Sequence, residues 1–244
     1  MTINIENTIA FVTGANRGLG RAITEGLLNA GAQKIYTAVR NVDSVNELVE
    51  QYGERIVPLE YDLTRSETLT AAVAQAKDVN FVVSNAGALQ LSSASGDDAV
   101  EGLQYHMERN VYPVSALASA FGDILKANGG GAFVQLNSIV SMKTFPQFTG
   151  YSASKAASFA ITQALHHEWA EQGTQVVSVI AGPIKTDMAD TAGVSEGAPL
   201  PSVVWDSLHK ALKEGDFFVF PDPMSQEIAA SYMPFAAEAL EISH

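Results

Sequence analysis

The strongest chemical signal in the chain is a tyrosine and a lysine one helical turn apart. Tyr151 and Lys155 open a helical stretch that extends to about Glu171. Positions i and i+4 lie on one face of a helix, so the phenol and the ammonium can reach a shared ligand. A phenol has a pKa of about 10, and a nearby ammonium favours the phenolate. Lowering that pKa by about 3 units takes about 4 kcal/mol, which requires a low dielectric and a second positive charge. Under those conditions Tyr151 would be a general acid and base at neutral pH, whereas a solvated surface pair would have no role.

A serine hydroxyl can assist that phenol. Ser138 ends a predicted strand, thirteen residues before Tyr151. At the carboxyl edge of a sheet, its hydroxyl can hydrogen-bond a substrate oxygen while charge develops on that oxygen. Ser141 is the nearest alternative, but it lies beyond the strand, so we favour Ser138.

An asparagine lies where a helix should be distorted. Asn110 falls in a helical stretch from about residue 101 to residue 127 that contains Pro113. Proline cannot donate a backbone hydrogen bond and crowds the carbonyl four residues earlier, so we expect a bend near Arg109 and Asn110. A carbonyl freed there could bind water and open a proton path to Lys155. A kinked core helix with no such role fits the same pattern.

Three glycines at a strand-to-helix turn predict a dinucleotide site. After the predicted strand 9–13 come Gly14, Gly18 and Gly20, in Gly-x-x-x-Gly-x-Gly spacing, and then a helical stretch to about Asn29. Such glycines let the backbone approach a pyrophosphate, whose charge meets free N–H groups and the positive helix end. An oxidised nicotinamide would supply the second positive charge near the phenol. A turn that merely needs positive φ is the alternative. Three further residues of this loop are expected to bind the cofactor: Asn16, Arg17 and Leu19.

Two arginines favour one form of the nucleotide. In dinucleotide sites an acidic residue about 20 positions on usually receives the ribose hydroxyls, whereas an arginine accommodates a 2′-phosphate. Here the second predicted strand is followed by Arg40 rather than a carboxylate, and Arg17 lies in the glycine loop. The two guanidinium groups can bracket a phosphate, which favours NADP(H). Asp43, three residues on, keeps NAD(H) open, and two solvated arginines remain the alternative without a ligand.

Polar and small residues follow the third and fourth predicted strands. Asp62 and Leu63 lie at the end of the third, where the carboxylate can accept from an adenine amino group. Asn85, Ala86 and Gly87 follow the fourth, where small side chains allow close approach to a ribose. Because Asp, Asn and Gly also favour loops, ordinary turn chemistry explains both sets equally well.

Together these motifs resemble the short-chain dehydrogenases/reductases, in their single-domain branch, from about residue 5 to residue 188. The resemblance implies a catalytic tetrad of Asn110, Ser138, Tyr151 and Lys155. In it, Lys155 would bond the nicotinamide ribose and lower the pKa of Tyr151, which transfers the proton. Ser138 would hold the substrate oxygen, and Asn110 would organise a water relay.

The resemblance extends to the stretch 181–186, in which Gly182, Ile184 and Thr186 would contact the cofactor and the last two would bond the nicotinamide carboxamide. Ser84 and Ala181 replace the usual asparagine and proline. The family's Gly-rich strand with an Asp-Gly-Gly close is absent, and a helix over 225–240 is predicted instead. This departure leaves the substrate lid and the usual tetramer contacts open.

These side chains need a parallel sheet to bring them together. Short apolar runs rich in β-branched residues alternate with helical stretches, a pattern typical of parallel strands with crossover helices. We predict an α/β fold, a Rossmann-like, doubly wound, seven-stranded parallel sheet with helices on both faces. The predicted strands are 9–13, 34–39, 56–61, 81–84, 132–136, 175–180 and 217–220. No repeat or linker divides the chain, so we expect one domain over 1–244, with loops at 91–96 and 189–201, a substrate loop at about 187–215 and an atypical C-terminal segment at about 216–244.

Composition argues against several classes of partner. Lys and Arg number 14 against 27 Asp and Glu, and the net charge of −13 repels phosphate backbones and anionic membranes. We therefore expect no nucleic-acid or membrane partner. With no cysteine and five histidines that lack ligand spacing, we expect no metal. The amino terminus lacks the pattern of a signal peptide and no apolar run approaches about 18 residues, so a cytoplasmic protein is predicted.

The predicted activity is that of an NADPH-dependent carbonyl reductase or alcohol dehydrogenase, with the cofactor supplying hydride and the protein supplying position and a proton. A non-catalytic NADP(H)-binding sensor or regulatory protein is the alternative from another class, but it would not need the whole tetrad. An acyl-carrier-linked ketoacyl reductase needs a basic face, which the net charge disfavours.

The substrate and the assembly carry weaker signals. Apolar side chains near the motifs could build a pocket for a hydrophobic ketone, although aromatic residues more often belong to a core. The candidates are Phe145, Phe148, Met188 and Trp205. An alanine-rich face on the Tyr151 helix fits a homodimer or homotetramer, and packing within the chain explains it equally well.

Overall fold

The computed structural model describes residues 3–239 and has the predicted α/β fold. Within that range seven parallel strands form one sheet in the order β3-β2-β1-β4-β5-β6-β7. Because the order runs outward from β1 and β4 in opposite directions, a crevice opens at their carboxyl ends. The strands are β1 (Ile9–Thr13), β2 (Lys34–Val39), β3 (Ile56–Glu60), β4 (Phe81–Ser84), β5 (Gly131–Ser138), β6 (Thr174–Ala181) and β7 (Phe218–Val219).

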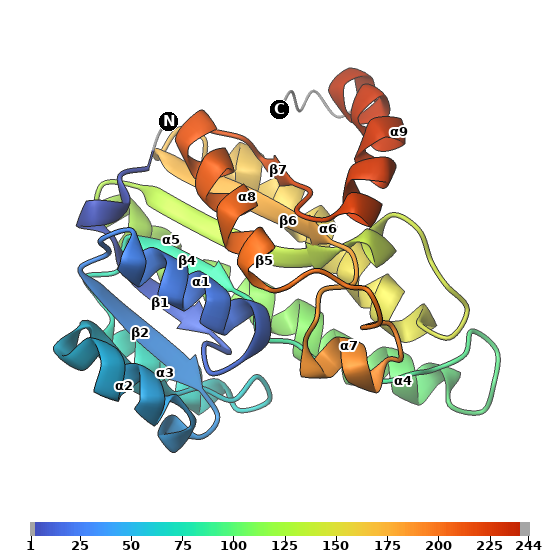
Figure 1. Ribbon diagram of the computed structural model, residues 1–244, viewed down its shortest axis with the longest axis horizontal. Helices are drawn as coiled ribbons and strands as arrows, with labels where there is room; N and C mark the ends of the chain where they lie inside the picture. The colour runs from blue at the N-terminus through green and yellow to red at the C-terminus, as the bar shows by residue number, and fades with distance from the viewer. Residues whose placement is uncertain (1–2, 240–244) are drawn as a thin grey trace.

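Helices cover both faces of this sheet (Figure 1). Side chains alternate between the faces along each strand, so Phe11 and Val12 of β1 join different halves of the core. Val12 packs under α1 (Gly18–Asn29), α2 (Asn46–Tyr52) and α8 (Ser202–Glu214). Phe11 packs under α3 (Ser66–Gln75), α5 (Tyr112–Ala127) and α6 (Thr149–Glu168). The two apolar layers hold the strand ends in fixed relation, and the strand ends carry the site.

The distortion expected near Asn110 is a π-helical turn. Helix α4 (Ala99–His106) continues into this turn at Met107–Val111 and then into α5. Pro113 lies in the first turn of α5, where its missing N–H and its ring prevent regular α-helical bonding to the preceding turn. Asn110 therefore lies on the widened turn, inside the protein.

Several segments differ from the prediction. The predicted substrate loop at about 187–215 contains the whole of α8, whose apolar face packs in the core. The stretch 189–201, predicted as a loop, begins inside a short helix, α7 (Asp187–Thr191). Helix α7 is too short for a clear helical pattern in the sequence. It begins after Thr186, whose Oγ1 caps it by accepting from the Ala189 N–H at 3.3 Å. Strand β7 is also two residues shorter than predicted. The last helix, α9 (Pro223–Ala239), starts two residues before its predicted range of 225–240, of which residue 240 lies outside the described part.

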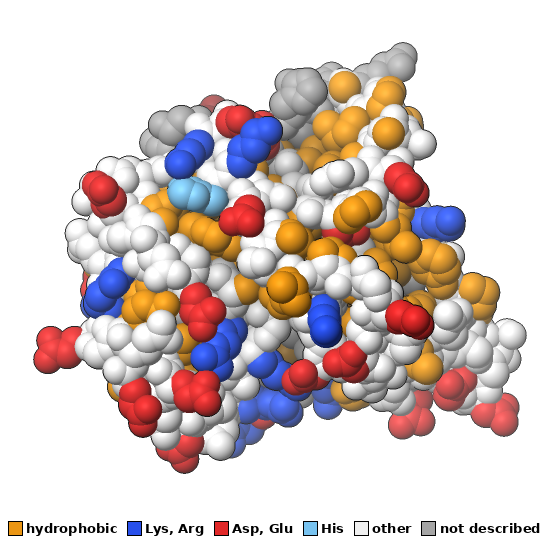
Figure 2. Space-filling view, viewed as in Figure 1, with side chains coloured by type: hydrophobic (Ala, Val, Ile, Leu, Met, Phe, Trp, Pro, Cys, Tyr) orange, Lys and Arg blue, Asp and Glu red, His pale blue; other side chains and the backbone are white. Residues whose placement is uncertain are grey.

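Helix α9 is fixed to the sheet layer by aromatic contacts. The Tyr232 ring lies 6.4 Å from that of Phe159 and 6.0 Å from that of Phe218, between ring centroids. On its outer side Met224 and Phe235 are exposed, and Figure 2 shows hydrophobic side chains along this helix at the upper right. Across residues 3–239, no helix combines the length and apolar character needed to cross a membrane.

Candidate active site

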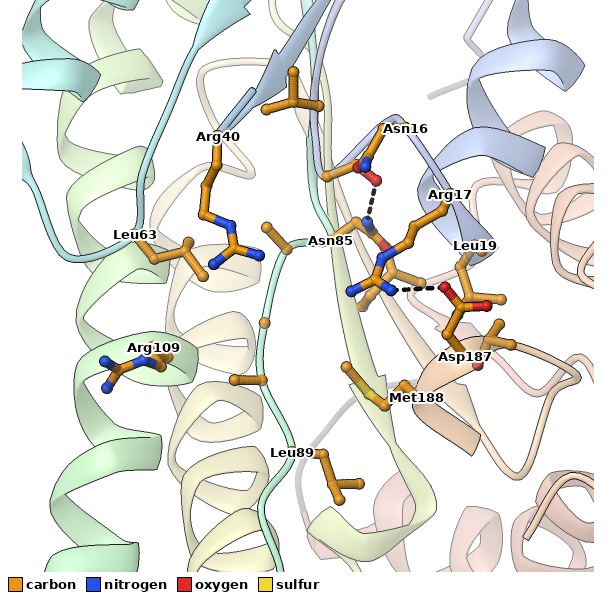
Figure 3. A pocket seen from close by; sticks show the side chains of 18 of the residues that line it. Asn16, Arg17, Leu19, Arg40, Leu63, Asn85, Leu89, Arg109, Asp187 and Met188 are labelled. Atoms are coloured by element: carbon orange, nitrogen blue, oxygen red, sulfur yellow. Dashed lines mark hydrogen bonds and ion pairs between the residues drawn. The ribbon is translucent and has the colours of Figure 1, made fainter. Parts of the chain in front are cut away.

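A cleft of about 770 Å³ lies where the strand order reverses, at the carboxyl ends of β1, β2, β4 and β5 (Figure 3). It brings together most of the residues that the sequence predicted for a nucleotide and a reaction. The predicted residues that line it are Gly14, Asn16, Arg17, Gly18, Leu19, Arg40, Asp62, Leu63, Asn85, Ala86, Gly87, Tyr151, Lys155, Thr186 and Met188.

The glycine loop is shaped by backbone conformations and contacts that other residues cannot match. Gly14 and Gly18 have φ of 66° and 55°, a region that L side chains rarely adopt. At Gly20 the constraint is space, since an added Cβ would stand 2.2 Å from the Gly14 carbonyl oxygen. The first turn of α1 therefore packs directly on the loop and leaves a cradle at the amino end of the helix. Helix N–H groups at such an end suit an anion.

Asn85 braces this loop from the next strand. Its Nδ2 donates to the carbonyl oxygens of Thr13 at 2.8 Å and Gly14 at 3.3 Å. Thr13 Oγ1 accepts in turn from the backbone N–H groups of Asn85 at 2.9 Å and Ala86 at 3.0 Å. These bonds tie the end of β1 to the end of β4, so the side chain of Asn85 sets the shape of the cradle.

Tyr151 and Lys155 lie together in the cleft, at a part that we call its closed end because Lys155 is buried there. Lys155 is buried, its Nζ donates to the Leu136 carbonyl oxygen at 2.7 Å, and it lies 5.8 Å from the centroid of the Tyr151 ring. The Ser138 side chain interacts with the Tyr151 phenol and lowers its pKa. Ser141 Oγ instead donates to the Ser138 carbonyl oxygen at 2.6 Å. This arrangement favours Ser138 over Ser141 as the hydroxyl that assists the phenol.

Burial dominates the titration of this pair. It raises the pKa of Tyr151 to about 12, and the interaction with the Ser138 side chain offsets only part of that shift. It lowers the pKa of Lys155 to about 8. The expected acidification of the phenol by Lys155 is therefore not seen in the protein alone. Burial penalises the charged form of both groups, and a second positive charge beside the phenol would favour the phenolate.

Asn110 uses its whole side chain to hold a neighbouring segment. Its Oδ1 accepts from the Ala88 N–H at 2.8 Å, while its Nδ2 donates to the Ala88 carbonyl oxygen at 2.9 Å. The same Nδ2 reaches Ser154 Oγ on α6 at 3.0 Å. The side chain thus joins α6 to the segment that follows β4. Any water relay at this residue would have to use backbone groups of the π-helical turn.

The cleft is positively charged in an acidic protein. Its lining holds four cationic side chains, Arg17, Arg40, Arg109 and Lys155, and two carboxylates, Asp62 and Asp187. Sequence reasoning missed Arg109 and Asp187. Arg109 immediately precedes Asn110, and its guanidinium stacks 4.1 Å from the centroid of the Tyr105 ring, which also lines the cleft. A concentration of positive charge in a protein of net charge −13 fits an anionic ligand.

One ion pair crosses the mouth of the cleft. Arg17 Nη1 lies 2.6 Å from Asp187 Oδ2, which joins the glycine loop to the start of α7 (Figure 3). Both side chains are about two-thirds exposed, at 65% and 69%. Such a pair is held weakly, so Arg17 is free to turn to another anion.

Asp62 forms the turn that the sequence left open as the alternative. Its Oδ1 accepts from the Thr64 N–H at 2.9 Å and from Thr64 Oγ1 at 2.7 Å. These hydrogen bonds hold the pKa of the Asp62 carboxyl below its ordinary value. The same residue lines the cleft, so the turn orients the carboxylate for any contact it makes there.

Comparison with known proteins adds the family. The sequence model described as short chain dehydrogenase matches residues 8–196, well over half of the chain. The chain is a short-chain dehydrogenase/reductase. This confirms the resemblance that the motifs carried, and it places the protein among oxidoreductases of which several relatives act on alcohols and polyols.

Three relatives illustrate the range of this family. A short chain dehydrogenase from Burkholderia cenocepacia, solved in complex with NADP, is 33% identical to this dehydrogenase, covers 98% of this chain and 99% of its own, and has a TM-score of 0.87. An NAD-dependent glycerol dehydrogenase from Listeria innocua is 27% identical over 98% of this chain and 90% of its own. A galactitol 2-dehydrogenase (L-tagatose-forming) from Cereibacter sphaeroides is 32% identical over 75% of this chain and 74% of its own.

Two residues expected at the cofactor lie elsewhere in this dehydrogenase. Gly182 packs against the C-terminal segment: its N–H donates to Asp222 Oδ2 at 2.7 Å, and an added Cβ would meet that carboxyl at 2.4 Å. Ile184 is buried in the core. Of the stretch 181–186, only Thr186 reaches the cleft. The sequence could not separate these roles because the buried carboxylate that engages Gly182 lies 40 residues further on.

Three of the four residues predicted for an aromatic pocket do not line the cleft. Trp205 of α8 packs on α1, where an added Cβ at Gly26 would stand 2.2 Å from its ring. Phe148 is buried beside Ser92, and Phe145 packs on the core half that includes α6. Only Met188 lines the cleft. The prediction relied on nearness in sequence to the motifs, but large aromatic side chains are more often buried in the core than exposed in a cleft.

Proposed function

We propose that the protein is an NADP(H)-dependent carbonyl reductase or alcohol dehydrogenase that interconverts a ketone and a secondary alcohol. The observation that carries the proposal is that Tyr151 and Lys155, with Ser138 beside the phenol, line the closed end of a cleft that also holds a glycine cradle. A nucleotide sensor would need the cradle but not the buried phenol and amine. The NADP complex of the Burkholderia relative supports the cofactor class, and the NAD-dependent relative keeps NAD(H) as a second ligand.

The residues of the cleft fit a phosphorylated dinucleotide. The cradle around Gly14, Gly18 and Gly20 would hold the pyrophosphate, and an added Cβ at Gly20 would push the first turn of α1 away from the loop that shapes it. Arg17 and Arg40 would bracket a 2′-phosphate through charge-assisted hydrogen bonds. When bound, the nicotinamide nucleotide supplies the hydride.

The protein handles the proton. With its pKa raised to about 12, Tyr151 is a protonated phenol throughout the neutral range, the form that donates a proton to a carbonyl oxygen during reduction. Ser138 would hold the same oxygen. In the oxidative direction the phenolate is required, so Lys155 and the positive charge of the oxidised cofactor must act together to stabilise it. Oxidation should therefore gain from alkaline pH more than reduction does.

The substrate we propose is a small ketone or secondary alcohol. Leu89 and Met188 give the lining apolar surface, while Tyr105 and Arg109 add polar groups. A mixed lining fits a partly polar carbonyl compound better than the wholly hydrophobic ketone that the predicted aromatic pocket required. The polyol substrates named for two relatives point the same way.

Tyr151→Phe tests this proposal. We expect it to reduce kcat/KM by about 10³-fold, within the range for loss of a general acid. NADPH binding measured by calorimetry should stay within about threefold of wild type, because the phenol is not part of the phosphate cradle. The assay follows NADPH and NADH absorbance over a panel of aromatic ketones, aliphatic ketones and ketoses. Wild-type binding of NADPH without turnover of any member would favour the sensor.

We also propose a homodimer or homotetramer. The small side chains Ala153, Ala156, Ala160 and Ala164 form an exposed strip along α6, which allows close approach of another helix. Sedimentation equilibrium would test this, and a monomer at micromolar concentration would contradict it.

A further inference from the structure

The segment that follows β4 is fastened to α4 and its π-helical turn by a ladder of two side chains. Asn110 pairs with both backbone polar groups of Ala88. One helical turn earlier, His106 Nε2 accepts from the Gln90 N–H at 3.1 Å. Four residues of helix advance about 6 Å and two residues of extended chain about 6.6 Å, so the two spacings match. The two side chains can therefore bond the segment at two positions two residues apart, much as neighbouring strands bond at every second residue.

The His106 rung requires one specific tautomer. The residue is fully buried, and its Nδ1 lies 2.6 Å from the Gly102 carbonyl oxygen. That carbonyl can only accept, so Nδ1 carries the proton and Nε2 presents its lone pair to the Gln90 N–H. Protonation of Nε2 would set two donors against each other. Only the neutral imidazole completes both bonds.

The same imidazole lies against the catalytic phenol. The ring centroids of His106 and Tyr151 are 5.8 Å apart. Gly150, the residue before Tyr151, has no room for a side chain, since an added Cβ would stand 2.9 Å from His106 Nδ1. Ser92 Oγ accepts from the Gly150 N–H at 3.3 Å. The segment 88–92 thus touches the first turns of α6 at one end and forms the Leu89 wall of the cleft at the other.

We propose that His106 is a positioning residue, whose neutral imidazole fixes the segment 88–92 against Tyr151 and whose protonation in acid releases that segment and weakens substrate binding. Only the part concerning turnover rests on the proposed function. The part concerning the segment can be tested in the protein without substrate.

The charges around His106 favour its neutral form. Burial is the largest cause that lowers the pKa of His106. The hydrogen bond to the Gly102 carbonyl raises this pKa, and the nearby cations Arg109 and Lys155 lower it further. The other titratable neighbours are the phenols of Tyr105 and Tyr151, and the segment 88–92 carries no ionisable side chain. Because the folded pKa is below the unfolded one, the ladder is complete above about pH 6.5 and is lost as the pH falls through the folded value.

Two variants test the two hydrogen bonds of the His106 imidazole separately. His106→Gln can present an amide oxygen where Nε2 was and so keeps an acceptor for the Gln90 N–H. His106→Asn can keep a donor for the Gly102 carbonyl but leaves the partly buried Gln90 N–H without its acceptor. At pH 8 we expect His106→Asn to raise KM for the ketone by about tenfold with a smaller change in kcat, the cost of one lost hydrogen bond to a partly buried donor. His106→Gln should recover KM to within about threefold of wild type by the same reasoning.

The pH profile is the second readout. Wild-type kcat/KM should fall reversibly in acid, as the pH falls through the lowered pKa of His106, and His106→Gln should lack that acid limb because it cannot titrate. His209→Gln is the matched control: this histidine stacks on Trp205 of α8 and does not line the cleft, so its profile should follow wild type. An acid limb that survives in His106→Gln, or equal KM values for the Asn and Gln variants, would overturn the proposal.

Hydrogen exchange distinguishes a failure of this inference from a failure of the proposed activity. In the substrate-free protein the Gln90 amide should exchange at least about tenfold faster in His106→Asn than in His106→Gln, after correction for intrinsic rates. It should also exchange faster in wild type at pH 5.5 than at pH 7.5 after the same correction. If no carbonyl compound is turned over but these differences appear, the ladder stands and the proposed function fails. Unchanged Gln90 exchange would overturn the ladder whatever the activity.

Discussion

The cleft holds its charged groups in two opposite ways. At the closed end Lys155 is 6% exposed and fixed to a backbone carbonyl. At the open end Arg17 and Asp187 form an ion pair in which both side chains are about two-thirds exposed. Burial moves the pKa of Lys155 to about 8, whereas solvent screens the exposed pair.

This difference suits the buried groups to proton transfer and the exposed groups to ligand recognition. A desolvated amine and phenol respond strongly to one added charge, which is what proton transfer coupled to a cofactor requires. Exposed arginines respond weakly to any single partner, and they can move from Asp187 to a phosphate at little cost. Substitutions at the closed end should therefore have large effects on turnover, and those at the open end small effects on affinity.

The largest effect is expected for Lys155→Met. Turnover should fall by about 10³-fold, because the phenolate loses its stabilising ammonium. Stability should move the other way: the free energy of unfolding at pH 7 should rise by about 1 to 3 kcal/mol, since the ammonium is desolvated in the folded state.

The pH dependence of the stability gain tests whether burial of the Lys155 ammonium destabilises the folded protein. The folded pKa of Lys155, about 8, lies below its unfolded value, so the native state regains stability as the pH rises from about 8 to about 10.5. The advantage of Lys155→Met should shrink over that range in urea unfolding. A variant that is less stable than wild type at pH 7 would break the comparison between the two ends.

Gly20→Ala should have the next largest effect. The added Cβ would meet the Gly14 carbonyl oxygen at 2.2 Å, so the cradle must open, and NADPH affinity by calorimetry should fall by about 100-fold. Gly53→Ala is the control, because Gly53 also has positive φ, at 61°, but an added Cβ there meets nothing within 4 Å. It should lose stability and keep its affinity for NADPH. Equal losses of affinity would mean that backbone strain, not the cradle, governs binding.

Arg40→Ala sharpens the assignment of the open end. Loss of one charge-assisted contact to a 2′-phosphate should weaken NADPH binding by about tenfold and leave NADH binding within about twofold. Arg65→Ala is the matched control, since Arg65 pairs with Glu60 outside the cleft. If Arg40→Ala weakens both nucleotides equally, Arg40 serves the common part of the cofactor and the NADP(H) preference has another source.

The smallest effect is expected for Asp187→Asn. Removing the carboxylate frees Arg17, so NADPH should bind about two- to fivefold more tightly, in keeping with the small free energy of an exposed ion pair. NADH affinity should change less, and raised ionic strength should reduce the difference. Weaker NADPH binding in this variant would show that the ion pair closes the cleft over the nucleotide instead of competing with it.

The sequence by itself determined the fold and most of the cleft. Residues that follow predicted strands can be placed from the sequence, because the carboxyl ends of buried parallel strands all lie at one edge of the sheet. Gly14, Gly18 and Gly20 were readable for that reason, and so was the i, i+4 relation of Tyr151 and Lys155. The distortion at Asn110 was readable as well, since proline acts on its own helix.

Only the tertiary structure decided which side chains face the cleft away from those strand ends. Trp205 had the right chemistry for a pocket but packs on Gly26, and Gly182 is held by a carboxylate 40 residues away. His106 shows the converse, since nothing in its spacing pointed to Gln90 or to the phenol beside it. Local spacing fixes what lies within one turn or one strand, whereas contacts between distant segments depend on how the core packs, and burial then sets the pKa values on which the chemistry depends.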